Sequence, residues 1–581
     1  MGRLFIAARE KLRRVRDTYY RAKYLLTSRL AGRGGAHPEL SQKGLLLIQF
    51  DALPYETFCS AMERGYLPFL RRQLLRKRFT LKKWYVGIPS NTPSVQAAVM
   101  YGNNDDIPGF RWYEKDAKLH VNFKSPLSAG LIESRLERFE GLLDGGSSYS
   151  NMFSGKASTS VATLGSFTTM TLGKRLRGFR IFALVLVNLF TVVRTIFLTF
   201  WEFFLELYDW LHAVRHQVIQ RGEYLFPLYR ILMNVWVREI VTVGAAVDIA
   251  RGTPSVYVSY LAYDELAHQR GPFSKSAMNS LLTIDRRIKR LVQLARRKIL
   301  REYDVFIFSD HGLAASMPFF FLYRQTLPQL VTELVNGKPG EAVREHYCEA
   351  QVTYARILAL KLATYEDGLM RGVRSIVKAF RSVLVRAGLE SAIAKEEEGH
   401  QQSDGLVVAV SGPLGHIYLP AAGALQDGDI QSRYAALLPG LVSHNGIGVV
   451  MTRLDGGAMI RSKQGSAVVN HAGQIVRCEG DPLPGIEPKD LAYRGLLRVM
   501  KMKNAGDVVV LGADHGGYIV NFEEQMAGHG GVGGLQNSAF LMHQPAYSWI
   551  RDIDDPLKLH EIFKSIKAQN TADEHTEPVR V

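Results

Sequence analysis

The chain has 581 residues, and 72 Lys and Arg against 55 Asp and Glu give it a formal net charge of +17 at pH 7. Its 47% hydrophobic and 22% charged content is that of a folded chain with a sizeable core, which excludes a disordered or collagen-like polymer. The three cysteines, Cys59, Cys348 and Cys478, are too few and too far apart for a disulfide scaffold or a thiolate zinc module, so any metal must bind to His and carboxylates.

Nearly half of the net charge lies in residues 1–43, where eleven Lys and Arg stand against three acids, a local balance of +8. Apolar residues interleave with these bases, as in a basic amphipathic helix on an anionic membrane surface; the alternative is a solvated helix packed on the protein. The apolar run after Arg3 is broken at Arg9, far short of the roughly 7–15 apolar residues of an export signal. We therefore expect a cytoplasmic protein associated with the inner face of the membrane. The bases form no recognisable groove-reading motif, so we expect no nucleic-acid partner.

The first predicted buried strand, 44–50 (GLLLIQF), ends at Asp51. Residues 87–102 (GIPSNTPSVQAAVMYG) indicate a loop that feeds a helix, since Pro93 suits a first helical turn. Thr92 would lie at the helix N-terminus, where free N–H groups favour a phosphoryl group, and metal coordination would make its hydroxyl a nucleophile. The alternative is a simple Ser/Thr N-cap, the commoner role of such a sequence.

Residues 181–200 (IFALVLVNLFTVVRTIFLTF) carry one charge, Arg194, and are long enough to span a bilayer. Catalytic groups on both sides of this stretch would require an even number of crossings, and the only return candidate, 231–250, carries three charged residues. The sequence therefore favours an interfacial or re-entrant helical hairpin over a single transmembrane helix. The alternative is a buried helix of an insertion.

Continuous apolar runs separated by helical stretches predict an α/β fold with a mostly parallel central sheet and helices on both faces. Such sheets gather their sites at the carboxyl ends of the strands. Three further runs end next to metal-ligand residue types: 255–261 before Asp264 and His268, 304–309 before Asp310-His311-Gly312, and 507–513 before Asp514-His515-Gly516.

Asp264 and His268 are four residues apart, so on a helix they would share one face and reach one ion, although such a pair alone is usually an ordinary surface pair. His529 lies in AGHGGVGG, a backbone too flexible for a core element, and such a loop can close over a metal. Asp and His ligands without thiolate suit Zn²⁺ or Mn²⁺ in hydrolytic sites, often as a pair of ions.

The order Asp51, Thr92, YLAYDELAHQRGP (260–272), FSDHG (308–312) and GHGG (528–531) resembles the type I phosphodiesterase/nucleotide pyrophosphatase branch of the alkaline phosphatase superfamily. The resemblance implies an alkaline phosphatase-like fold with two divalent metal ions, Zn²⁺ or alternatively Mn²⁺. It also implies that Thr92 attacks phosphorus in line and that water then hydrolyses the phosphothreonine. One ion would be held by Asp51, Asp310, His311 and the Thr92 oxygen, and the other by Asp264, His268 and His529.

The sequence departs from the family pattern in 105–116 (DDIPGFRWYEKD), where the family often has an Asn that contacts a phosphate oxygen. Asn91 or Arg111 could replace it as a substrate-binding residue, although Arg111 could equally belong to a structural ion pair. The second Asp-His-Gly, 514–516, mimics the first. We assign the metal to 310–312, because that motif follows the preceding Asp/His pair at the short interval of the family, and the second motif then has a supporting role or none.

These motifs predict a catalytic core interrupted by insertions: a helical apolar one and a smaller α+β one. In chain order the predicted segments are 1–43, a basic amphipathic N-terminal extension; 44–113, the first segment of the catalytic core; 114–250, a helical, partly membrane-interfacial insertion; 251–321, the second segment of the catalytic core; 322–500, an inserted α+β cap region; 501–567, the third segment of the catalytic core; and 568–581, a flexible tail.

The sequence thus predicts a metal-dependent phosphoric ester hydrolase: a two-metal phosphodiesterase with a Thr nucleophile. It would act near an anionic membrane surface on a phosphorylated lipid, isoprenoid or nucleotide-type substrate. One alternative is a headgroup transferase of the same superfamily, in which an alcohol replaces water. Another is a catalytically inactive membrane-associated scaffold, against which the seven suitable ligand positions argue. The sequence leaves the oligomeric state open.

Overall fold

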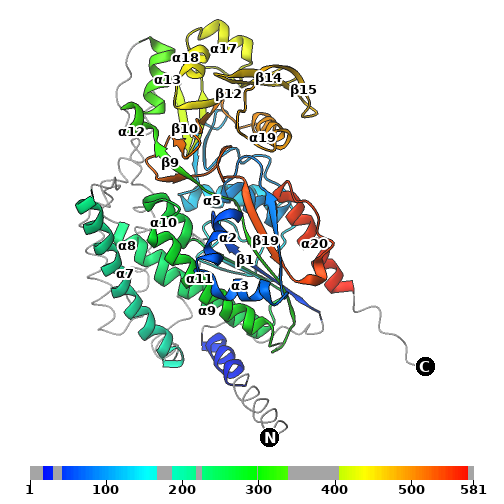
Figure 1. The fold of residues 1–581 in the computed structure, drawn as a ribbon. Coiled ribbons are helices and arrows are strands. Elements are labelled where there is room, and N and C mark those ends of the chain that lie inside the picture. The colour runs from blue at the N-terminus through cyan, green and yellow to red at the C-terminus, as the bar shows by residue number, and fades with distance from the viewer. Residues whose placement is uncertain are drawn as a thin grey trace.

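The computed structural model describes residues 18–30, 42–166, 183, 186–216, 226–297, 299–337 and 405–572. Two seven-stranded sheets organise these residues, one mainly parallel and surrounded by helices, the other antiparallel (Figure 1). The central sheet has the order β2-β19-β8-β1-β7-β5-β6. Its strands are β1 Gly44–Phe50, β2 Thr80–Tyr85, β5 Ser147–Tyr149, β6 Thr159–Val161, β7 Ser255–Tyr260, β8 Tyr303–Ser309 and β19 Ser538–His543.

Both faces of the central sheet are covered, which explains why its strands are apolar without alternation. Strand β1 pairs in parallel with β7 and β8, and all its residues are buried. Its residues Leu46 and Ile48 pack into one apolar cluster, whereas Leu45 and Leu47 pack into another on the opposite face. Only β19 runs antiparallel to its neighbours, β8 and β2.

Helices from widely separated regions of the chain form the two covering layers. The first layer contains α2 Tyr55–Glu63, α3 Pro68–Leu75, α9 Arg238–Arg251, α10 Ala262–Arg270 and α11 Lys275–Ala295. The second contains α4 Thr92–Tyr101, α5 Pro126–Leu136 and α20 Pro556–Ala572. The structure therefore confirms the predicted α/β fold with a mostly parallel sheet and helices on both faces.

The parallel register aligns the carboxyl ends of three strands. Phe50, the last residue of β1, is opposite Tyr260 of β7 and Ser309 of β8. Asp51 and Asp310 therefore follow at the same edge of the sheet, and α10 begins next to them. This edge is where the predicted ligands gather.

The second sheet has the order β10-β11-β16-β12-β13-β14-β15 and is antiparallel. The prediction that the run 507–513 forms a strand like those of the parallel sheet is wrong, because β16 pairs antiparallel with β11 and β12. Val509 and Val510 face different clusters, so this strand is also buried on both faces and has the same apolar pattern.

The strands of the second sheet are β10 Val407–Ser411, β11 Leu414–Tyr418, β12 Ile447–Leu454, β13 Gly457–Ser462, β14 Gly465–Asn470, β15 Ile475–Gly480 and β16 Val508–Gly512. The helices that pack against this sheet are α13 Leu327–Asn336, α17 Asp427–Arg433, α18 Leu437–Ser443 and α19 Lys489–Lys501.

The described portion of the N-terminal segment, residues 18–30, is a helix that packs on the protein. Tyr24 is buried, and its hydroxyl accepts hydrogen bonds of 2.9 and 2.7 Å from Nε and Nη2 of Arg290 on α11. The packed-helix alternative therefore holds for residues 18–30. Residues 1–17 and 31–41 lie outside the described residues, and membrane contact by the N-terminal segment stays a prediction.

Residues 189–200 of the apolar stretch form the first part of a long helix, α7 Leu189–His216, which lies at the outer edge of the molecule beside α8 Phe226–Ile231 (Figure 1). Residues 181, 182, 184 and 185 lie outside the described residues. Arg230 of α8 is buried and pairs with Glu202, Glu206 and Asp209 of α7 at 2.8, 2.5 and 2.9 Å. A π-helix, Leu232–Val237, then leads into the buried α9. Among the described residues, no helix is both long enough and apolar enough to cross a bilayer.

The C-terminal helix α20 extends to Ala572, beyond the predicted start of the tail at 568. Asn570 anchors this last turn, because its Nδ2 donates a 2.9 Å hydrogen bond to Asp304 Oδ2. Residues 573–581, and residues 338–404 of the predicted α+β insertion, lie outside the described residues.

Candidate active site

The first group of predicted ligands lies where β1 and β8 end. Asp51, Asp310 and His311 are all buried there. Thr92 is the first residue of α4, and its Oγ1 lies 3.1 Å from Asp51 Oδ1 and 3.1 Å from His311 Nε2. His311 Nε2 is also 3.5 Å from Asp310 Oδ2 and 3.7 Å from Asp51 Oδ1. The fold thus brings the four residues predicted for one ion to a single point.

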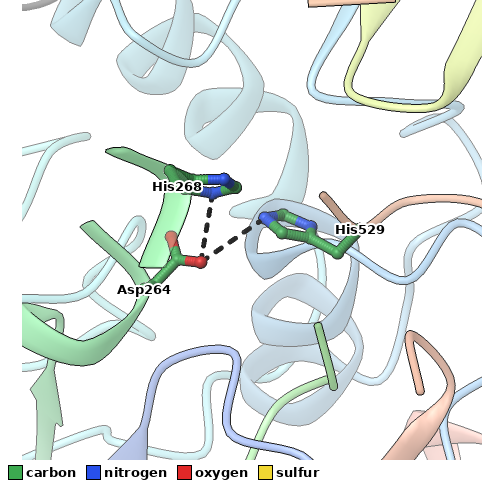
Figure 2. A group of neighbouring side chains, drawn as sticks. All are labelled: Asp264, His268 and His529. Carbon is green, nitrogen blue, oxygen red and sulfur yellow. Dashed lines mark ion pairs between the residues drawn. The ribbon is translucent and has the colours of Figure 1, made fainter. Parts of the chain in front are cut away.

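The second group joins helix α10 to a C-terminal loop (Figure 2). Asp264 and His268 lie one helical turn apart, with 3.1 Å between Asp264 Oδ1 and His268 Nε2. His529 follows the short strand β18 (Ala527–Gly528), and its Nε2 is 3.8 Å from the same carboxylate oxygen. The ring centroids of His529 and His311 are 4.1 Å apart, so the two groups are neighbours.

All three imidazoles are oriented by backbone carbonyl oxygens. The Nδ1 atom of His268 lies 2.7 Å from Ala527 O, that of His311 lies 2.9 Å from Gly312 O, and that of His529 lies 3.1 Å from Ser90 O. Each carbonyl accepts a hydrogen bond from Nδ1–H, so Nε2 is the nitrogen that faces the carboxylates and could bind a metal. This arrangement is typical of histidines that bind a metal.

Buried carboxylates dominate the electrostatics of the site. Burial, and then repulsion from Asp310, raise the pKa of Asp51 well above its usual range. Burial also raises the pKa of Asp310. Burial opposes the ionisation of Asp264, but the adjacent His268 lowers the pKa of Asp264 to about 2, and Asp264 in turn raises the pKa of His268 to about 9. Burial and the neighbouring His311 hold the pKa of His529 well below its usual value.

The residues present fit divalent metal ions. Asp310 Oδ2 is buried and accepts no hydrogen bond from the described residues, and it points into a group of oxygen and nitrogen ligands. A cation bound there would offset the repulsion between Asp51 and Asp310. Each group offers three carboxylate or imidazole atoms within 4.8 Å of one another, and Thr92 lies beside the first.

Close backbone packing holds the His311 and His529 loops together. A Cβ atom on Gly312 would lie 1.9 Å from Leu535 O, so only glycine fits between them. The Gly312 N–H donates to Gln536 O at 2.9 Å, and the Gln536 side chain in turn accepts from Gly531 N at 3.0 Å. The Gly after Asp310-His311 is therefore required by its close packing against the backbone of residues 535–538.

The two predicted substrate-binding residues have different surroundings. Asn91 caps helix α4, since its Oδ1 accepts a 3.0 Å hydrogen bond from Ser94 N. Its Nδ2 is buried next to Thr92 without a hydrogen-bond partner among the described residues. Arg111 instead pairs with the buried Glu523 and donates to Val410 O at 3.1 Å, which is the structural role that the sequence left open.

The second Asp-His-Gly motif does not join the metal ligands. Asp514 and His515 are exposed. Asp514 Oδ1 accepts from Gly516 N at 2.8 Å and its Oδ2 from Gly534 N at 2.9 Å. Asp514 thereby supports the glycine-rich loop that follows His529, and the choice of 310–312 over 514–516 agrees with this geometry.

Sequence reasoning missed three residues that hold the site together: Ser90, Glu523 and Gln536. Ser90 Oγ accepts a 3.1 Å hydrogen bond from Gly530 N, next to His529. Ser90 lies in the loop 87–102, directly before Asn91, so its role next to the site could have been predicted from the sequence. Glu523 pairs with Arg111, 412 residues away, and the backbone carbonyl of Gln536 accepts from Gly312 N, so nothing in the local sequence indicated either contact.

A family model matches the middle of the chain. The family model described as type I phosphodiesterase/nucleotide pyrophosphatase matches residues 205–351, a range that contains Asp264, His268, Asp310 and His311. The match confirms the resemblance seen in the motifs and the expectation of an enzyme of the phosphoric ester hydrolase class. It begins inside the segment that the sequence assigned to the helical insertion.

Two solved structures align with most of the chain at low sequence identity. Phosphonoacetate hydrolase from Sinorhizobium meliloti 1021, in complex with phosphonoformate, aligns with 11% identity and a TM-score of 0.43, over 91% of this chain and 96% of that chain. Murine ectonucleotide pyrophosphatase/phosphodiesterase 5 aligns with 9% identity and a TM-score of 0.41, over 91% of this chain and 95% of that chain. No curated protein matches the sequence.

Proposed function

Because the chain carries a phosphodiesterase/nucleotide pyrophosphatase signature on a ligand cluster of matching chemistry, we propose that it is a two-metal phosphodiesterase with Thr92 as nucleophile. The observation that carries the proposal is the position of Thr92 Oγ1, 3.1 Å from both Asp51 Oδ1 and His311 Nε2, at the N-terminus of a buried helix. Bound divalent ions would stabilise the charge on the attacking and leaving oxygens. We propose Zn²⁺ or Mn²⁺, because the ligands are carboxylates and imidazoles.

The chain's own residues orient the nucleophile and the phosphate. The Thr92 hydroxyl donates its hydrogen to Asp51 Oδ1, which directs an oxygen lone pair toward the site. Attack of Thr92 Oγ1 on phosphorus breaks the bond to the leaving alkoxide and gives a phosphothreonine, which water hydrolyses. The buried Asn91 Nδ2 supports a role for that amide as a donor to a phosphate oxygen.

A kinetic experiment tests the nucleophile. Purified protein with Mn²⁺ or Zn²⁺ is assayed on a bis-aryl phosphodiester and on an aryl phosphate monoester, with Thr92→Ala and Thr92→Ser as variants. We expect the diester to be preferred, Thr92→Ala to lose activity by about a thousandfold or more, and Thr92→Ser to retain a fraction of it. Full metal-dependent activity in Thr92→Ala would rule out the nucleophile.

We further propose that the substrate is a phosphorylated lipid, isoprenoid or nucleotide-type molecule and that the enzyme works at the cytoplasmic face of an anionic membrane. The +8 balance of residues 1–43 supports this location. In fractionated cells we expect the protein in the membrane pellet at low salt and its release at high salt or alkaline pH. Recovery only in the supernatant at low salt would contradict the location and leave the chemistry untouched.

A further inference from the structure

Three arginine side chains from different helices converge on one carboxylate at the junction of α7, α9 and α11. Arg194 of α7 and Arg287 of α11 both pair with Glu239, the latter also through Nε at 2.5 Å. Arg238, which is 5% exposed, has its Nε 4.0 Å from the same carboxylate. Its Nη1 donates to Thr283 Oγ1 at 2.7 Å. Three positive charges therefore share one negative charge.

A second acid that interacts with the cluster, Glu202, is already engaged. Glu202 interacts with Arg238 electrostatically, but its Oε1 lies 2.8 Å from Arg230 Nε and 3.3 Å from Asn234 Nδ2. Lys23, on the N-terminal helix 18–30, and Arg290 add positive charge beside Arg194. The junction therefore has an excess of buried positive charge.

The excess positive charge affects Arg194 and Arg238 directly. The Nε–H groups of Arg194 and Arg238 are buried and have no hydrogen-bond acceptor among the described residues. Burial and repulsion from Arg287 lower the pKa of Arg238 to about 10 and also lower the pKa of Arg194. Two buried donors in a field of like charge are the features of an anion-binding site.

The surroundings of Arg194 indicate the source of the anion. Its side chain is 30% exposed, so the cluster is open to solvent on the α7 side. Phe190 and Phe197, one helical turn before and after it, are 78% and 65% exposed. The helix 18–30 packs beside this end of α7, where Asn188 Nδ2 lies 3.4 Å from Thr27 Oγ1. A cluster of arginines that reaches solvent at Arg194 and is flanked by exposed aromatic side chains matches an anionic lipid: a phosphate with acyl chains next to it.

We propose that the arginine cluster of Arg194, Arg238 and Arg287 binds the phosphate of an anionic phospholipid, while the exposed aromatic face of α7 enters the interfacial layer of the bilayer. This face runs the length of the helix, and its exposed aromatic side chains include Phe190, Phe197, Phe200, Trp201, Phe204 and Trp210. The same helix is tied to the metal-ligand helix α10, because Glu206 Oε1 pairs with Arg270 Nη2 at 2.5 Å. A bilayer bound at α7 would therefore be held in a fixed position relative to Asp264 and His268.

Vesicle flotation of the full chain tests this site. The vesicles are phosphatidylglycerol/phosphatidylcholine or pure phosphatidylcholine, at about 0.15 M salt. The variant is Arg194→Gln, and the matched control is Arg215→Gln, which removes the same charge from the exposed C-terminal end of the same helix. We expect wild type and Arg215→Gln to float with anionic vesicles. Arg194→Gln should bind these vesicles at least about fivefold more weakly. Phe197→Ser, a change at an exposed position, should also weaken binding.

Other outcomes have defined meanings. Equal binding of all variants, equal loss in both arginine variants, or no binding of wild type to anionic vesicles would overturn the proposal. In a separate arm, inorganic phosphate is added during thermal unfolding without vesicles. A phosphate-dependent rise in Tm that Arg194→Gln abolishes, together with no vesicle binding, would assign the site to free phosphate and overturn the lipid source. Activity on a water-soluble diester, measured in parallel, separates failure of this inference from failure of the proposed function.

Discussion

The backbone carbonyl oxygen of Ser90 lies 3.1 Å from Nδ1 of His529, so the loop that presents the proposed nucleophile also orients a candidate metal ligand from the far end of the chain. The Ser90 hydroxyl strengthens the link, since it accepts from Gly530 N at 3.1 Å and donates to Gly531 O at 3.3 Å. The two segments are more than 400 residues apart in sequence. The candidate ligand His529 and the proposed nucleophile Thr92 are therefore positioned by the same contact.

This link predicts the effect of Ser90→Ala. The variant keeps the carbonyl that orients His529 but loses both hydroxyl contacts, which loosens the loop. We expect about tenfold weaker metal binding, as for other residues that orient metal ligands, and a loss of roughly 1–3 kcal/mol of unfolding free energy, because the buried Gly530 N–H loses its acceptor. Titration with Zn²⁺ against a competing chelator measures it, and Ser443→Ala, whose hydroxyl donates to Gly440 O at the end of α18, serves as the control. Wild-type affinity in Ser90→Ala would contradict the role of the link.

The Asp310→Asn substitution should stabilise the metal-free protein and abolish its stabilisation by metal. Burial raises the pKa of Asp310 in the metal-free fold, so its ionised form at neutral pH costs stability. The amide keeps the oxygen that accepts from Ala52 N and His311 N, at 3.2 and 3.0 Å, and removes the buried charge. We expect the metal-free variant to be more stable than wild type by roughly 0.5–2 kcal/mol and to gain no further stability from added Zn²⁺.

Denaturant unfolding with and without metal checks both halves of this prediction. Asp455→Asn is a suitable control, because Asp455 lies in an exposed turn between β12 and β13, away from the candidate ligands. A metal-free Asp310→Asn protein that is less stable than wild type would show that the ionised Asp310 carboxylate does not destabilise this fold. A metal-dependent rise in its Tm equal to that of wild type would remove Asp310 from the ligand set.

The strand ends that carry the site were predictable because the residues that determine them are adjacent in sequence. A run such as GLLLIQF has no polar face, so it must be buried on both sides, and an Asp directly after it must lie at the sheet edge. The same rule misplaced 507–513, since burial on both faces does not indicate which sheet a strand joins. The Arg111–Glu523 pair joins residues 412 apart, and no local pattern reveals such a contact.

His416 predicts a pH dependence of stability that is independent of the metal ligands. This buried residue of β11 accepts from Gly506 N through Nδ1 at 3.2 Å, so its Nε2 carries the hydrogen and donates to Pro108 O at 3.1 Å. Burial lowers its pKa from 6.5 to about 4. The unfolded chain therefore binds a proton below pH 6.5 that the folded chain does not, and stability falls as the pH falls from 6.5 to 4.

Urea unfolding at several pH values tests the prediction for His416 against His416→Gln. Between pH 6.5 and 4 we expect the unfolding free energy of wild type to fall more steeply than that of the variant, by about 1.4 kcal/mol per pH unit. All other titrating groups are common to both proteins, so the difference isolates this imidazole. Parallel curves would show that His416 is protonated in the folded state.

Two Gly→Ala substitutions are expected to act in opposite directions. At Gly312 the new methyl group would lie 1.9 Å from Leu535 O and 2.6 Å from Ser538 O, and both neighbours are backbone atoms that cannot rotate away. Gly428 lies in the exposed first turn of α17 with nothing within 4 Å of an added Cβ. Gly428→Ala should therefore stabilise the protein by about 0.5–1 kcal/mol, because it reduces the entropy of the unfolded chain. Gly312→Ala should destabilise it by about 3 kcal/mol or more and reduce activity, because the His311 and His529 loops must separate to admit the methyl group.

Thermal unfolding and diester hydrolysis of the two variants measure both effects. Equal Tm values for Gly312→Ala and wild type would show that the loops are not packed as the structure describes.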